Sequence, residues 1–111
     1  MPYDETTVKR IRRILSRRRG VVERKMIGGL SFMVSGMLCC GVNRTGILVR
    51  IAPEMRQQML GQPHVRPMKL SRRTISSFVR VEPEGYRTDA ALAKWVRMGV
   101  RFALAASRRT G

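Results

Sequence analysis

Two short apolar runs that meet at Ser35-Gly36 constrain the fold of this 111-residue chain more than any other feature. The first run is Leu30–Val34 and the second is Met37–Cys40. Each run has the length of a strand, and a two-residue link that ends in Gly is typical of a tight hairpin turn. A third run, Gly46–Ile51, follows closely. Because strands with such short links pair as neighbours, we expect an antiparallel meander.

Helical and strand patterns alternate in the rest of the chain. Apolar residues at helical spacing predict three helices, at Glu5–Arg18, Pro53–Leu60 and Asp89–Ala106. Alternating residues predict two more strands, at Met68–Leu70 and Ser76–Val81. The segment Val21–Met26 fits either a lead-in strand or an extended link.

The sequence therefore predicts an α+β domain with the order α-β(3)-α-β(2)-α. We expect two layers, with the first and last helices packed on the apolar face of one antiparallel sheet. Asp4 is the expected N-cap of the first helix, and Thr88 or Asp89 that of the last. The domain should span residues 3–106, with a frayed tail at 107–111.

The charge of the chain has two competing interpretations. Twenty-three Lys and Arg against seven Asp and Glu give a formal net charge of +16, and nineteen of the basic residues are Arg. Because guanidinium groups pair well with phosphate, one interpretation is a salt-sensitive, sequence-indifferent contact with nucleic acid. The other is a basic proteome background, which fits the scatter of these residues along the chain. The candidate contacts are Arg10, Arg13, Arg17, Arg18, Arg19, Arg72 and Arg73.

No catalytic or metal-binding constellation stands out in the sequence. Cys39 and Cys40 are neighbours, so on a strand one should face the core and the other a helix or the surface. Buried cysteines used as small apolar residues are the favoured interpretation, and a thiol redox role is the alternative. The single histidine, His64, lies in a predicted loop. We therefore expect no metal, no cofactor and no enzyme activity.

The remaining expectations concern location and partners. No apolar run approaches the ~20 residues needed to cross a bilayer, and the first residues lack the pattern of a signal peptide. We expect a cytoplasmic protein without membrane contact. A protein partner or a homodimer, held by an exposed sheet face or edge, is the expected interaction.

Several blocks of the sequence resemble the TfoX N-terminal domain family. They are K-M-I-G-G-L-S-F-M-V-S-G-M-L-C-C-G-V, G-I-L-V-R-I and D-A-A-L-A-K-W-V, and the resemblance runs from about Tyr3 to Ala106. It implies the same element order, which type III secretion chaperone-like domains share. The matching residues with an implied structural role are Gly28, Gly29, Phe32, Gly36, Cys39, Cys40, Gly41 and Trp95.

The resemblance also implies a non-enzymatic interaction module that is accessory to transcription. The family includes a regulator of DNA-uptake competence. That regulator carries a second, C-terminal helical domain, so its competence role is not carried over to this chain. The family supplies no catalytic residue.

Overall fold

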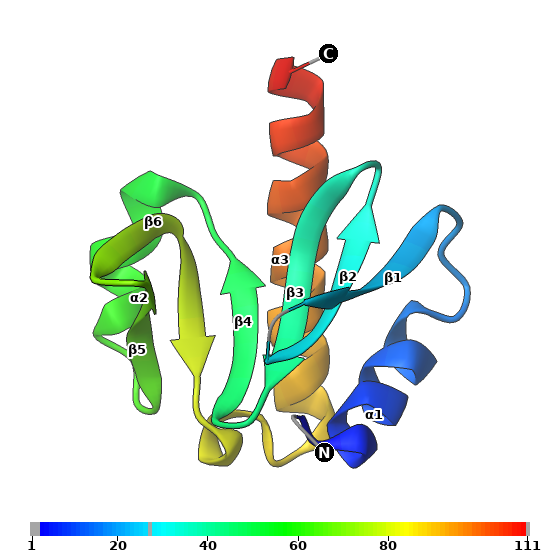
Figure 1. The fold of residues 1–111 in the computed structure, drawn as a ribbon, viewed down its shortest axis with the longest axis horizontal. Coiled ribbons are helices and arrows are strands. Elements are labelled where there is room, and N and C mark those ends of the chain that lie inside the picture. Colours follow the sequence, from blue (N-terminus) through cyan, green and yellow to red (C-terminus); the bar gives the residue numbers. More distant parts are fainter. Residues whose placement is uncertain (1–2, 27, 111) are drawn as a thin grey trace.

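Six strands pair into one antiparallel sheet in the computed structural model, which describes residues 3–26 and 28–110 (Figure 1). They are β1 (Val21–Met26), β2 (Gly29–Val34), β3 (Met37–Asn43), β4 (Gly46–Arg50), β5 (Val65–Leu70) and β6 (Arg73–Val81). Their order across the sheet is β1-β2-β3-β4-β6-β5. The strands β1 and β5 therefore form the two edges.

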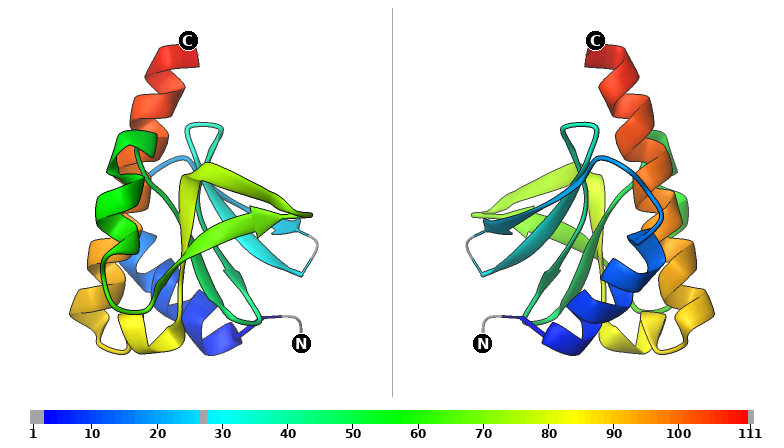
Figure 2. Two further views of the ribbon diagram at one scale, coloured as in Figure 1. Left: turned by 90° about the vertical axis from the view of Figure 1, so that its left-hand side faces the viewer. Right: turned by 90° about the vertical axis from the view of Figure 1, so that its right-hand side faces the viewer.

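Three helices lie on the same face of this sheet (Figure 2). They are α1 (Glu5–Leu15), α2 (Arg56–Leu60) and α3 (Asp89–Thr110), and 3₁₀ turns at Pro53–Met55 and Pro83–Tyr86 precede α2 and α3. The predicted α+β class, with helices on one face of an antiparallel sheet, is confirmed. The order is α-β(4)-α-β(2)-α, because Val21–Met26 is a full strand that pairs with β2 along all six of its residues.

Local polar groups set the helix ends. Asp4 caps α1, since its carboxylate accepts a hydrogen bond from the backbone N–H of Thr6 at 3.0 Å. This helix ends at Leu15, earlier than predicted, where the hydroxyl of Ser16 donates to the carbonyl of Arg13 at 2.9 Å. Thr88 caps the start of α3. That helix includes residues 107–110, for which the sequence predicted a frayed tail.

The core forms where α3 crosses the middle of the sheet. Leu92, Trp95, Val96, Val100 and Ala103 are buried on this helix, and the inward residues of β3, β4 and β6 are buried beneath them. Their 3-4 spacing is the pattern that predicted the helix. Packing of this apolar face is the main stabilising contribution available to a domain of this size.

The central hairpin has the predicted turn, with one unpredicted irregularity. Ser35 and Gly36 have φ angles of 52° and 78°, as a two-residue turn between twisted strands requires. The register of β2 and β3 shifts, so that Phe32 faces Cys40 while the next residue faces Leu38. Cys39 is therefore the extra residue of a β-bulge.

The bulge changes where the two cysteines point. Cys40 is paired with Phe32 and Val49, which are both core residues, and the thiol of Cys39 lies 3.9 Å from the carbonyl oxygen of Val96 on α3. Both side chains are fully buried. One cysteine therefore faces the core and the other contacts a helix, which is one of the two arrangements that the sequence predicted, and neither lies at the surface.

Candidate anion-binding groove

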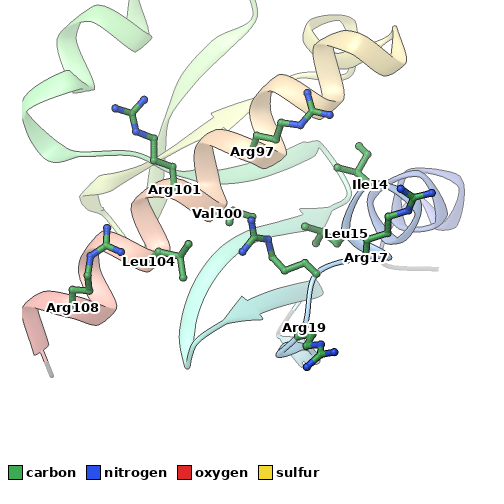
Figure 3. A pocket seen from close by; sticks show the side chains of 10 residues that line it. Ile14, Leu15, Arg17, Arg19, Arg97, Val100, Arg101, Leu104 and Arg108 are labelled. Carbon is green, nitrogen blue, oxygen red and sulfur yellow. The ribbon is translucent and has the colours of Figure 1, made fainter.

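A groove of about 710 Å³ separates the end of α1 from the second half of α3 (Figure 3). Six arginines and four aliphatic residues line it. The arginines are Arg17, Arg18, Arg19, Arg97, Arg101 and Arg108, and the aliphatic residues are Ile14, Leu15, Val100 and Leu104. We call this feature the arginine groove.

The wall formed by α3 follows from helical periodicity. Arg97, Arg101, Leu104 and Arg108 are spaced i, i+4, i+7 and i+11, and residues at this spacing share one face of a helix. At the helical rise of 1.5 Å per residue, the first and last of them are separated by about 16 Å along the axis. The helix therefore presents a straight basic stripe along the groove.

The opposite wall is formed where α1 ends. Arg17, Arg18 and Arg19 follow the last helical residue, and all three are exposed. Gly20 then has a φ of 77°, a conformation that glycine adopts easily, before the chain enters β1. The early end of α1 thus places three consecutive arginines on the side of the groove opposite the stripe on α3.

The floor of the groove is apolar. Leu15 and Val100 are buried, and Ile14 and Leu104 are half-buried and pack against the core. Arginine stems pack well on such a surface while their charged ends stay in water. An anion that enters therefore lies between the arginine side chains at the rim and the apolar floor. Its attraction to the guanidinium groups is less screened near that floor than in open water.

No carboxylate balances these charges within the part of the chain that the structure describes. The ion pairs found there join Arg10 to Asp89, Arg12 to Glu23 and Arg66 to Glu82. None of them includes a groove arginine, and no acidic residue lines the groove. The attraction for an external anion is therefore not offset by a neighbouring negative side chain.

The structure separates the predicted nucleic-acid contacts into groups. Arg17, Arg18 and Arg19 line the groove. Arg10 has a structural role, because its guanidinium donates to Asp89 and to the carbonyl oxygens of Tyr86 and Arg87, which ties α1 to the start of α3.

The other three candidates lie outside the groove. Arg13 is exposed on α1, and Arg72 and Arg73 lie at the β5–β6 turn, at the sheet edge opposite β1. Arg97, Arg101 and Arg108 line the groove but were not among the candidates predicted from the sequence. Their i, i+4, i+11 spacing was the available signal.

The residues with an implied structural role lie in the sheet and core, away from the groove. Gly28 and Gly36 have positive φ angles, and a Cβ at Gly29 would meet the carbonyl oxygen of Val42. Gly41 lies close to the backbone of β2, Phe32 is buried, and the indole N–H of Trp95 donates to the carbonyl of Gly85 at 3.2 Å.

The cysteines are poorly placed for chemistry. Contact with the Cys39 thiol, together with burial, raises the pKa of Cys40, which disfavours the reactive thiolate. His64 is exposed in a turn, and residues 3–26 and 28–110 contain no group of three or more His, Cys, Asp or Glu side chains that could hold a metal ion.

We therefore expect neither thiol to react with Ellman's reagent in the native protein within minutes at about pH 8, because burial blocks access and disfavours the thiolate. Both should react at once in concentrated denaturant, which serves as the control. The measurement is the absorbance of the released thiolate. Rapid reaction of one thiol in the native state would instead support a redox role.

The fold and the groove define a small α+β domain with a basic groove between two helices. Across the described residues, no helix is both long enough and apolar enough to cross a membrane. A family model described as the TfoX N-terminal domain matches residues 13–103, and the chain belongs to this family. Comparison with the curated proteins and with the solved structures finds no match.

Proposed function

We propose that this domain is a non-enzymatic interaction module, accessory to transcription, that binds the phosphate backbone of nucleic acids through the arginine groove. The observation that carries the proposal is the assembly of six arginines in one groove without a carboxylate. Membership of the TfoX N-terminal domain family supports a regulatory module. The proposal includes a cytoplasmic location.

The chemistry of the lining favours binding over catalysis. Arginine stays protonated at neutral pH, so it cannot act as a general acid or base. Its planar fork donates two parallel hydrogen bonds to a phosphate, and all six cations of the groove are arginine. Guanidinium groups without a titrating partner are suited to holding an anion rather than to transforming it.

The geometry favours a repeating anion. The basic stripe from Arg97 to Arg108 covers about 16 Å, which corresponds to roughly five phosphates of one strand at 3.4 Å each. Among the described residues, no aromatic side chain lines the groove, so bases have no ring there on which to stack. We therefore expect contacts to the backbone and little preference for sequence.

Salt dependence provides the quantitative expectation. If all six arginines neutralise phosphates, the logarithm of the binding constant should fall against the logarithm of salt with a slope of about −5 for duplex DNA and about −4 for a single strand. Dissociation constants near micromolar are expected at physiological salt. Fluorescence anisotropy with labelled duplex DNA and single-stranded RNA, at several salt concentrations, measures both quantities.

Two double variants test whether the groove is the site. Arg17→Gln with Arg97→Gln removes one charge from each wall, and we expect the duplex slope to become shallower by about 2 because two phosphate contacts are lost. The matched control, Arg72→Gln with Arg73→Gln, removes the same charge from an exposed turn at the far sheet edge. The control should bind almost as the wild type does. Equal losses in the two variants would assign binding to the overall charge and contradict the proposal.

A further inference from the structure

The sheet face that the helices leave uncovered is concave. Figure 2 shows the β1–β2 and β5–β6 hairpins extending away from the helices, on the opposite side of the sheet. A hollow of about 590 Å³ lies there, lined by residues of both edge strands as well as of the central strands. We call it the sheet trough. It lies on the opposite side of the sheet from the arginine groove, and the inference below does not depend on that groove.

Apolar side chains from both edges are exposed in the trough. Met26 at the end of β1 is 41% exposed and Leu70 at the end of β5 is 63% exposed, which makes them two of the three most exposed large apolar residues of the described chain. Leu48 and Met68 lie in the same hollow and are half-buried. Exposed apolar residues that cluster in a concavity are typical of an interaction site, unlike scattered ones.

The polar part of the trough carries one sign of charge. Arg66, Lys69 and Arg80 line it, and no acidic residue in the described part of the chain does. Glu82, which does not line the trough, pairs with Arg66 at 3.4 Å, and no ion pair of the described residues includes Lys69 or Arg80. A ligand of this surface must therefore combine apolar groups with negative charge.

We propose that the sheet trough docks a short amphipathic segment of another protein, with carboxylates next to large aliphatic side chains. Methionine side chains are flexible and polarisable, so Met26 and Met68 can adapt to aliphatic groups of varied shape. The basic residues then meet the carboxylates of the segment and fix its orientation. Charge complementarity and the exposed apolar area both select this occupant.

Two other occupants fit less well. A second copy of the chain would bring Arg66, Lys69 and Arg80 against the same three cations, and opposed like charges disfavour such a dimer. Nucleic acid would match the charge, but a phosphate backbone would leave the exposed aliphatic side chains of Met26 and Leu70 without a partner. An acidic amphipathic peptide is the partner that uses both kinds of side chain.

The test uses the full chain labelled with ¹³C at its methionine methyl groups and a synthetic peptide of three Glu-Leu-Leu-Glu repeats. We expect the methyl signals of Met26 and Met68 to shift on titration, while those of Met55 and Met98, on the helix side, stay in place. Met26→Leu and Met68→Leu variants assign the two signals. Because Leu70 is largely exposed, Leu70→Asp should leave the fold intact and weaken peptide binding at least tenfold.

Matched peptides distinguish the outcomes. Replacing Glu by Lys removes the carboxylates of the peptide, and replacing Leu by Gly removes its aliphatic side chains. Either change should abolish the shifts of the Met26 and Met68 signals, because the proposed site requires both. Equal shifts with the Glu-Gly peptide would show attraction by charge alone and overturn the proposal. Shifts that depend on protein concentration without any peptide would identify a second copy as the occupant. Shifts of these methyl groups on addition of a duplex oligonucleotide would identify nucleic acid, and either result overturns the proposal.

Discussion

Gly99→Ala should lower the free energy of unfolding by about 2–3 kcal/mol, although Gly→Ala within a helix normally raises it by up to about 1 kcal/mol. A Cβ at this position would lie 2.5 Å from the carbonyl oxygen of Cys39, which belongs to the backbone of β3. That atom cannot move aside as the end of a flexible side chain could. The helix must therefore lift from the sheet, which loosens the packing of Leu92, Val96 and Val100.

Gly61→Ala is the matched control for this prediction. Gly61 ends α2 with a φ of −77°, and the nearest atom to an added Cβ, the carbonyl oxygen of Gln58, lies at an ordinary 3.4 Å. The same substitution should change stability there by less than about 1 kcal/mol. Urea denaturation followed by circular dichroism measures both variants. If Gly99→Ala proved as stable as the wild type, the close contact between α3 and β3 would be contradicted.

The features that the sequence predicted correctly depend on neighbouring residues. The Ser35-Gly36 turn, the Asp4 cap and the apolar face of α3 each follow from residues within a few positions of one another. The interactions that produce these features are all between residues close in sequence, so the patterns can be interpreted before any fold is known.

The features that the sequence missed depend on pairing at a distance. Val21–Met26 is mostly exposed, so its pattern shows little alternation, and only its pairing with β2 makes it a strand. The bulge at Cys39 depends on the register between β2 and β3. Sequence spacing alone does not determine that register, because a shift by one residue changes which face every side chain occupies.

The arginine groove depends both on local sequence patterns and on packing between distant segments. Arg17 to Arg19 form a run that is obvious in the sequence, and the stripe on α3 follows from helical spacing. That the two face each other across one hollow depends on how α1 packs against α3. The scatter of basic residues along the chain suggested a background charge, but six of the nineteen arginines gather at one site.

The two proposed surfaces lie on opposite sides of the sheet, and both are basic. The arginine groove lies on the helix side, with aliphatic residues only at its floor, whereas the sheet trough exposes aliphatic residues next to its cations. A phosphate backbone fits the first and an acidic amphipathic segment fits the second. Together the two proposed surfaces would allow the domain to hold a protein next to a nucleic acid.

Replacing all six groove arginines by Gln should nearly abolish nucleic-acid binding, although removing six charges from +16 leaves a net charge of +10. We expect a loss of two orders of magnitude or more in affinity at about 0.1 M salt, with the salt slope approaching zero, because phosphate contacts supply nearly all of such binding. At that ionic strength, exposed charges more than about 10 Å apart are largely screened, so cations spread over the rest of the surface add little to one contact.

An isocharge variant separates a local site from the overall charge. In this variant, six exposed arginines outside the groove are replaced by Gln, so the net charge is again +10 and the groove stays intact. The six are Arg13, Arg24, Arg44, Arg72, Arg73 and Arg109. If the groove is the site, this variant keeps a duplex slope of about −5 and most of its affinity. If the charge is only background, the two variants lose affinity equally. Anisotropy titrations of both variants at matched salt distinguish binding by the groove arginines from binding by the overall charge of the protein, because the net charge is the same in each variant.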